Sequence, residues 1–351
     1  MSQRQFRHGK RIGIAEYCTD RYLRSATFSI FGRPFVVDLE TGVIGELSGP
    51  TPALSPQLSP DGRWVAYSCR GSLQLLDTRD EWARTLAEPD GPHVRWGLPE
   101  IIVAPGEIGW RQAVWWMPSS RKVLATRVDK TTVQREPIAS VDPSLRPPQL
   151  QHFRLAGTVN ATVALHLFDL DGRNIKVVWD DQSYPYLAAV RCSTDGLPLI
   201  VVRSSDGRRQ QTLEVDIHDG STRTLQIEDD VIWLELVPGV PARTVDGRLV
   251  HVGYGGGSRC IYVDGQPWTD SALQVCEILD VGSRDILFTA SSMLADVEIG
   301  EIHVYRATVG GIERMSRCPG VHTAARSGGV IVFSSQESHQ SETLTSVFKC
   351  A

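Results

Sequence analysis

Apolar residues occur along this chain in short runs that alternate with polar turn signals, and helical spacing is almost absent. The runs are rich in Val, Ile, Leu and Thr, and they are separated by Asp-Gly, Pro-Gly and Ser-Gly pairs. Short runs of this composition between turn residues are typical of strands. Asp-Gly also supplies the positive φ angles that a two-residue hairpin turn requires. The pattern therefore predicts an all-β fold built from hairpins.

Two turn patterns recur along the chain. The first is a strand that follows a Pro-Asp-Gly-like turn; it occurs at 58–67, which reads Leu-Ser-Pro-Asp-Gly-Arg-Trp-Val-Ala-Tyr, and more weakly at 116–124, 192–200 and 243–250. The second is a strand that ends in Asp before a Gly turn; it occurs at 35–42, 167–172 and 213–220, and in part at 73–77 and 261–265. Copies of the first pattern lie roughly 50–75 residues apart, near or above the ~40–50 residues of a four-stranded propeller blade.

This alternation predicts a β-propeller of about seven four-stranded blades, within a range of about six to eight. A single blade cannot bury both of its faces, whereas blades stacked around an axis bury one another. We expect a flexible N-terminus over 1–11 and a single propeller domain over 12–351, with the Pro-rich stretch 136–148 as an insertion on one face. No α/β-hydrolase domain is expected within this sequence. The predicted blade spans are 12–48, 52–90, 112–180, 185–229, 232–270, 275–318 and 321–350.

Composition and charge limit the classes of function. The formal net charge of −5 and the pI near 6.0 give no basic footprint for nucleic acid. No apolar run approaches the ~18 residues of a membrane helix, and the start of the chain has no apolar segment typical of a secretory signal. The seven cysteines are scattered without C-x-x-C spacing, which is typical of reduced thiols. We therefore expect a cytoplasmic protein that binds neither nucleic acid nor membranes.

The sequence shows no complete catalytic machinery. Gly256-Gly257-Ser258-Arg259-Cys260 approaches a nucleophile elbow, but it lacks the last Gly and lies between two β-runs. A hairpin is the better interpretation. The nine histidines have no metal-binding spacing, and there is neither a P-loop nor a dinucleotide motif. We predict no catalytic residue, no metal site and no cofactor.

The segment 97–129 contains a non-repetitive stretch around Glu107. It contains the pair Trp115–Trp116, which we expect to face opposite sides of a strand and to pack between blades. Glu107 follows Pro105-Gly106 in a stretch with loop character, and loops carry function more often than strands do. Two interpretations of Glu107 remain open: a carboxylate that meets a cation, or a solvated acidic side chain.

Four motifs of this segment occur in the order in which they stand in a known family. They are Gly97-Leu98-Pro99-Glu100-Ile101, Gly106-Glu107, Val114-Trp115-Trp116-Met117-Pro118 and Arg127-Val128-Asp129-Lys130. They resemble the Gly-Leu-Ala-Glu-Phe, Glu-Glu, Tyr-Trp-Trp-Ser-Pro and Arg-Val-Asp-Glu motifs in the propeller of dipeptidyl peptidase IV-type serine peptidases. These belong to the prolyl oligopeptidase (S9) family, and the likeness is greatest to actinobacterial members. Further matches keep the same order at 17–21, 35–39, 58–67, 156–160, 184–187, 235–241, 287–290 and 319–322.

The resemblance implies an eight-bladed propeller followed by an α/β-hydrolase domain, with a Glu pair that grips the free amino terminus of the substrate. Charge-assisted hydrogen bonds suit that task, because an ammonium has three donors. By resemblance, Glu107 would contact a peptide amino terminus, with Trp110, Arg111 and Arg127 around it. Only one carboxylate of the pair is present here, and the loss of one charge-assisted hydrogen bond costs on the order of 1.5–3 kcal/mol.

Two further departures shape the functional hypotheses. The family's catalytic Ser, Asp and His have no counterparts in this sequence, and its opening blade is missing or shortened, which would leave an edge for another chain to cover. Our leading hypothesis is a non-catalytic propeller, inactive alone, that binds peptide amino termini as a separated fragment or a degenerate paralogue. One alternative is a free-standing propeller that binds a protein or peptide partner or self-associates. The other is a part of an active dipeptidyl peptidase, acting in proteolysis, whose hydrolase domain lies on another chain.

Overall fold

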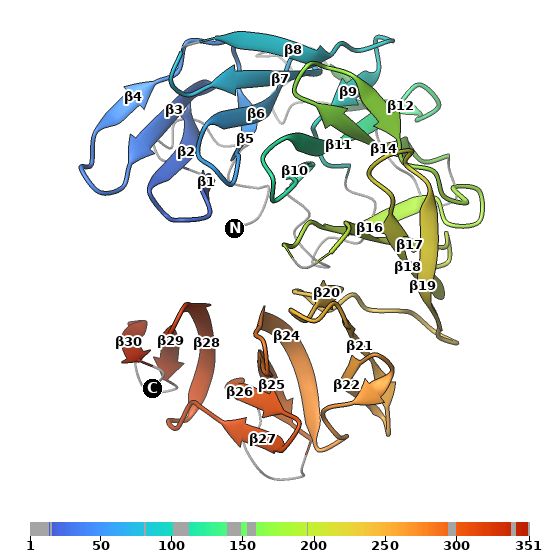
Figure 1. Ribbon diagram of the computed structural model, residues 1–351. Coiled ribbons are helices and arrows are strands. Elements are labelled where there is room, and N and C mark those ends of the chain that lie inside the picture. Colours follow the sequence, from blue (N-terminus) through green and yellow to red (C-terminus); the bar gives the residue numbers. More distant parts are fainter. Residues whose placement is uncertain are drawn as a thin grey trace. The chain divides into compact units, whose positions relative to one another are not determined.

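The computed structural model describes residues 14, 16–80, 82–100, 112–138, 149–152, 159–194, 196–293, 300–337 and 342–349. All the regular secondary structure in these ranges is β-strand (Figure 1). The same ranges contain no helix of the length and hydrophobicity that a membrane crossing needs. The N-terminal segment 1–11, predicted to be flexible, lies outside the described residues.

The chain divides into two compact units. The first comprises residues 1–186 and 215–222, and the second comprises residues 187–214 and 223–351. The prediction of one domain over 12–351 remains a prediction.

The strands of the first unit form consecutive antiparallel sheets (Figure 1). One sheet has the order β1 (Tyr17–Thr19), β2 (Ser25–Ile30), β3 (Arg33–Asp38), β4 (Ile44–Glu46), and the next has the order β5 (Leu54–Leu58), β6 (Trp64–Cys69), β7 (Ser72–Asp77), β8 (Ala83–Ala87). A third has the order β10 (Val114–Trp116), β11 (Lys122–Asp129), β14 (Thr162–Asp169), β15 (Asn174–Lys176), with β9 (Val94–Trp96) also paired to β11. The ends of the predicted insertion form a separate hairpin of β12 (Arg135–Ile138) and β13 (Gln149–His152).

The sheets that follow repeat this plan. The fourth sheet has the order β16 (Tyr186–Arg191), β17 (Leu199–Arg203), β18 (Arg209–Val215), β19 (Thr222–Asp229), and the fifth has the order β20 (Ala242–Arg243), β21 (Leu249–Gly255), β22 (Ser258–Val263), β23 (Gln266–Pro267). The sixth has the order β24 (Leu273–Val281), β25 (Asp285–Ser292), β26 (His303–Thr308), β27 (Gly311–Arg314). The last has the order β28 (Gly320–Ser327), β29 (Val330–Glu337), β30 (Leu344–Lys349). Each sheet is an antiparallel meander of consecutive strands, which is the structure of a propeller blade. The predicted all-β propeller fold is thus confirmed.

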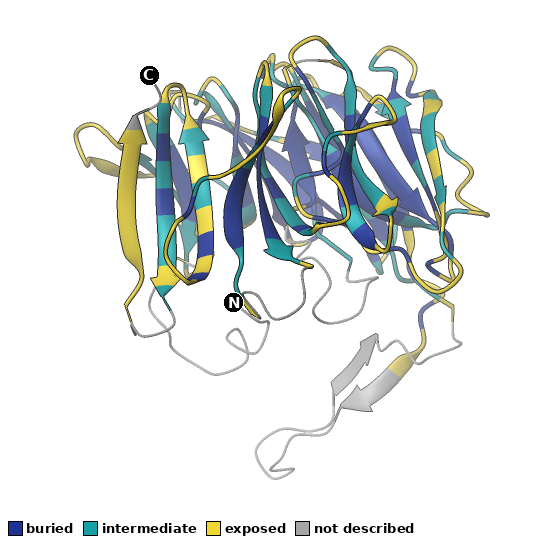
Figure 2. Cartoon of the chain, turned by 90° about the horizontal axis from the view of Figure 1, so that it is seen from below, coloured by how far each residue is buried: buried dark blue, intermediate teal, exposed yellow. Residues whose placement is uncertain are grey.

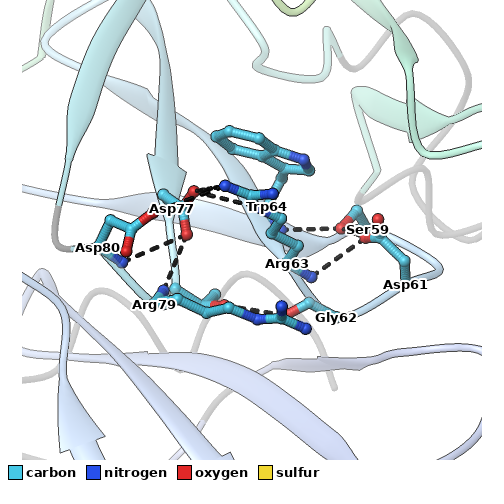
Figure 3. A network of polar contacts seen from close by, with 9 residues as sticks. Ser59, Asp61, Gly62, Arg63, Trp64, Asp77, Arg79 and Asp80 are labelled. Atoms are coloured by element: carbon cyan, nitrogen blue, oxygen red, sulfur yellow. Dashed lines mark hydrogen bonds and ion pairs between the residues drawn. The ribbon is translucent and has the colours of Figure 1, made fainter.

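The Pro-Asp-Gly signal forms the turn that was predicted for it, and side-chain hydrogen bonds hold it closed (Figure 3). The Ser59 hydroxyl donates to Asp61 Oδ1 over 2.6 Å and accepts from the Trp64 amide over 2.9 Å. Gly62 has a φ of +74°, which favours glycine at that position. Ser204-Ser-Asp206-Gly and Thr244-Val-Asp246-Gly repeat the same hydroxyl-to-Asp contact. The copy at 204–207 was not recognised in the sequence, although a Ser or Thr two residues before Asp-Gly would have identified it.

The aspartate that ends β7 links this turn to its own sheet. Asp77 Oδ2 accepts hydrogen bonds from Nε and Nη2 of Arg63 over 3.0 and 2.9 Å, and Oδ1 accepts from the Arg79 amide over 2.9 Å (Figure 3). Burial of the carboxylate opposes its ionised form. The hydrogen bonds from the Arg79 amide and the Arg63 guanidinium outweigh that effect, so the pKa of Asp77 lies below its ordinary value of 3.8.

Some strands are buried along most of their length and others are exposed (Figure 2). β7 is buried along its whole length, whereas β4 and β27, each at one edge of its sheet, are exposed along theirs. In the first unit, one buried cluster joins side chains of neighbouring sheets; it includes Ala66, Leu73, Trp96, Trp116, Val123 and Phe168. In the second unit, a comparable cluster includes Val250, Ile261, Val275, Ile286 and Phe288. Successive side chains of a strand point to opposite faces, and in β6, β7 and β17 both faces are buried, which is why these strands read as short continuous apolar runs.

Candidate functional site

The predicted site lies partly outside the described residues. Glu107, Trp110 and Arg111 belong to the undescribed stretch 101–111, so their role as peptide-binding residues remains a prediction. The structure describes Arg127 and the residues on both sides of that stretch. These show how the fold anchors the two ends of the 101–111 segment.

Described residues on both sides of the 101–111 segment are hydrogen-bonded to Thr126 on β11. On the entry side, the Gly97 amide donates to the Thr126 carbonyl over 2.9 Å, and the Thr126 hydroxyl donates to the Leu98 carbonyl over 2.9 Å. On the exit side, the Thr126 amide donates to the Ala113 carbonyl over 3.0 Å. Thr126 is only 1% exposed, so these bonds lie away from water. One buried residue therefore fixes both stems of the predicted loop.

Gly97 allows the chain to leave β9 at this point. Its φ of +65° is in the left-handed region, where side chains other than glycine are strained. A Cβ there would lie 3.1 Å from Leu73 Cδ1 and 3.2 Å from Val114 Cγ2. The glycine of the Gly97-Leu98 motif is thus required by conformation and by tight packing.

Arg127 lies beside this anchor, and carboxylates hold its guanidinium in place. Arg127 Nη2 is 2.8 Å from both carboxylate oxygens of Asp90 and 3.5 Å from Asp129 Oδ2. The side chain of Arg127 is 21% exposed, which leaves it partly accessible. Hydrogen bonds from Thr131 lower the pKa of Asp129, and the charge of Arg127 adds to that effect. The carboxylates offset the charge of Arg127 and orient it.

A second ion pair closes the entry stem. Lys130 Nζ lies 2.5 Å from Glu100 Oε2, and the Glu100 side chain is only 11% exposed. Lys130 therefore has a specific acidic partner. The sequence placed Glu100 in a family-like motif without a role for it, and no pattern singled out Asp90 or Thr126. Their roles depend on the pairing of β9 and β11, which places Arg127 opposite Trp96 and Asp129 opposite Val94.

Both tryptophans of the pair are buried, and the predicted packing between sheets is confirmed for Trp116. Trp115 and Trp116 are 7% and 8% exposed. Trp116 belongs to the cluster shared by neighbouring sheets, and its Nε1 donates to the Gln57 carbonyl over 2.9 Å. Trp116 thereby fastens β10, the strand after the 101–111 segment, to the preceding sheet.

The serine of the motif at 256–260, which approaches a nucleophile elbow in sequence, is not exposed in the structure. Ser258 follows the Gly256–Gly257 turn between β21 and β22, which confirms the predicted hairpin, and it is fully buried. A chain of Glu301, His303 and Ser316 also resembles an acid–His–Ser arrangement, with 2.8 Å contacts on both sides of the imidazole. His303 and Ser316 are buried, and the Ser316 hydroxyl accepts from the Val304 amide, so this chain serves as a structural link. No group of three or more His, Cys, Asp or Glu in the described ranges could hold a metal ion.

Comparisons with known proteins agree with the propeller fold. The family model described as the dipeptidyl peptidase IV (DPP IV) N-terminal region matches residues 18–242. Among solved structures, dipeptidyl peptidase 4 of Porphyromonas gingivalis is similar, with a TM-score of 0.79 and 16% identity over 98% of this chain and 52% of that chain. A putative dipeptidyl aminopeptidase IV of Bacteroides ovatus has a TM-score of 0.70 and 14% identity over 93% of this chain and 49% of its own. The present chain thus spans about half the length of these structures.

Proposed function

The chain belongs to the family of the dipeptidyl peptidase IV N-terminal region, and on that premise we propose that it is a non-catalytic propeller that binds the free amino terminus of a peptide at Glu107. The carboxylate of Glu107 would accept hydrogen bonds from the ammonium, with Trp110 and Arg111 on the same segment and Arg127 beside its stem. Charge-assisted hydrogen bonds of this kind are about twice as strong as neutral ones.

One observation supports this proposal most strongly: Thr126 anchors both stems of the 101–111 segment from inside the fold. A segment held at both ends loses less conformational freedom when a ligand binds, so more of the binding energy is realised as affinity. The pairing of Arg127 with Asp90 and of Lys130 with Glu100 offsets the cations next to the stems. These cations would otherwise repel an incoming ammonium.

The site can be tested by replacing the carboxylate without changing its shape. We expect Glu107→Gln to weaken the binding of the dipeptide amide Ala-Pro-NH2 about 10- to 100-fold, because a charged hydrogen bond contributes about 1.5–3 kcal/mol. Isothermal titration calorimetry measures the affinity directly. Glu40→Gln, in an exposed turn of the first sheet, is the matched control and should leave it unchanged. Equal affinity of the Glu107→Gln variant and the control would remove Glu107 from the proposal.

The comparison structures also support a second candidate function, in which this propeller works together with a hydrolase domain in proteolysis. The neighbours with dipeptidyl peptidase names are about twice as long as this chain. Under the leading proposal, the purified chain does not release the chromophore from an X-Pro chromogenic dipeptide. Turnover that is abolished by a serine-directed inhibitor would instead favour the second candidate.

A further inference from the structure

The second unit contains a cavity that the proposed peptide site does not involve. Its volume is about 260 Å³. Its walls come from the ends of β18 and β19, from β21 and β22, and from the connection at 229–235. The lining combines four carboxylates, two side-chain amides, an imidazole, a guanidinium and two aromatic rings; the residues used most below are Gln226, Glu228, His251, Tyr254, Arg259 and Tyr262.

The floor of this cavity presents acceptor atoms without donors. Glu228 accepts hydrogen bonds from the side-chain amides of Gln210 and, over 3.2 Å, of Gln226. The other end of the Gln226 amide, Oε1, is buried and has no hydrogen-bond partner in the structure. The same is true of His251 Nδ1. A buried polar atom without a partner costs about 1–3 kcal/mol. Both acceptors belong to residues that line this cavity, which favours a ligand with donors, and the same lining also carries one buried donor without a partner, Arg259 Nε.

The aromatic wall and the neutral imidazole suit a cation. His251 stacks on Tyr262 with ring centroids 5.2 Å apart and an interplanar angle of 12°. Burial lowers the pKa of His251 to about 4, so the ring is neutral at physiological pH and Nδ1 can accept a hydrogen bond. Tyrosine faces attract cations through their quadrupole, and Tyr254 adds a half-exposed ring at the edge.

The charges around the cavity are predominantly negative. Glu228, Asp229, Asp230 and Glu235 contribute four carboxylates to the lining. Arg259 is the cation of the same lining, and its guanidinium is already paired with Glu235. Burial raises the pKa of Glu228, while the Gln210 hydrogen bond and the charge of Arg203 act in the opposite direction. A positively charged ligand would favour the ionised carboxylate.

We propose that this cavity binds a primary alkylammonium ion, whose three N–H donors reach Glu228, Gln226 Oε1 and His251 Nδ1. The alkyl chain lies against the rings of Tyr262 and Tyr254 at the mouth. This site lies in the second unit and shares no residue with the Glu107 site, so each proposal can fail alone.

The probe for the test is n-butylammonium chloride, added to the full chain at low and constant salt and followed by saturation-transfer NMR. A dissociation constant of about 1 mM or below is expected for a ligand of this size. Butan-1-ol lacks the charge and tetramethylammonium lacks the donors, so both should bind at least about tenfold more weakly. No saturation by butylammonium below about 20 mM, or equal binding of butan-1-ol or tetramethylammonium, would overturn the proposal.

The site is assigned by a matched pair of variants. Glu228→Gln should weaken butylammonium binding at least about tenfold. Glu277→Gln is the control, because Glu277 is another half-buried carboxylate of the second unit with a pKa that burial raises, and it does not line the cavity. Unchanged affinity in Glu228→Gln contradicts the proposal.

If Glu228→Gln does not fold, Gly253→Val decides the question. A Cβ at Gly253 lies 3.5 Å from Tyr262 Cε2 and 3.6 Å from Glu228 Oε1, so larger side chains enter the cavity there. If the Gly253→Val protein is folded and still binds butylammonium with the wild-type affinity, the proposed site is refuted. If the folded variant loses binding, the proposed site is supported. Neither variant should change the affinity for Ala-Pro-NH2.

Discussion

Thr126→Val is the change that isolates the anchor of the 101–111 segment. Valine keeps the shape of the side chain and the two backbone hydrogen bonds of Thr126 but removes the hydroxyl that donates to the Leu98 carbonyl over 2.9 Å. Thr126 is 1% exposed, so water cannot easily replace the lost donor. We expect a loss of about 1–2 kcal/mol in the free energy of unfolding.

The same change should weaken peptide binding through the position of the loop. If the hydroxyl contributes about 1–1.4 kcal/mol to holding the segment in its binding arrangement, the affinity for Ala-Pro-NH2 falls about 5- to 10-fold. The midpoint of urea unfolding reports the stability, with an unchanged slope as the sign that the denatured state is unaffected. Calorimetric titration reports the affinity.

Thr27→Val separates the local effect from general destabilisation. Thr27 is fully buried on β2, and its hydroxyl donates to the Phe35 carbonyl over 2.8 Å, which is the same type of bond in another sheet. Both variants should lose similar stability, and only Thr126→Val should lose affinity. If Thr126→Val binds the peptide as tightly as Thr27→Val, the stems do not position the site and the reasoning is refuted.

Two further substitutions test other parts of the fold. Asp77→Asn should lower the free energy of unfolding by about 1.5–3 kcal/mol at pH 7, because it weakens the charged hydrogen bonds from Arg63. Since the folded pKa of Asp77 lies below its ordinary value of 3.8, its contribution is present above about pH 4 and is lost as the pH falls further. Chemical unfolding from pH 7 to pH 2.5 should show the two proteins converging, and a constant difference would contradict this. Gly239→Ala should lower the free energy of unfolding by more than about 2 kcal/mol, because φ is +90° and the new Cβ would collide with the Ile278 carbonyl. Gly247→Ala is the control: φ is +84° but the space around it is open, so it should cost only about 1 kcal/mol. Equal losses of stability in the two variants would count against the clash.

The parts of the fold that depend on local signals were predictable. The turn at Ser59–Gly62 and the hairpin at Gly256–Gly257 follow from residues that stand next to one another in the sequence. The burial of Trp115 and Trp116 follows from their place in a short apolar run. Local hydrogen bonds and positive φ angles carry these features, so the sequence is enough to predict them.

The contacts around the two candidate sites join strands that are distant in the sequence, so they were not predictable. Thr126 reaches Leu98 only because β9 and β10 both pair with β11, and a shift of one residue would turn its side chain to the other face. The cavity beside Glu228 likewise needs β19 and β21 from different sheets. Arg127 was identified through family resemblance, and nothing in the sequence revealed its pairing with Asp90.

The central claim is that this propeller binds peptides by their free amino terminus, and one comparison of ligands tests it directly. Calorimetric titration of the wild-type chain with Ala-Pro-NH2 and with its N-acetylated form changes only the ammonium. We expect measurable binding of the free amine and an affinity at least about tenfold lower for the acetylated peptide, since the charged hydrogen bonds to Glu107 are lost. Equal affinity for the two peptides would contradict it.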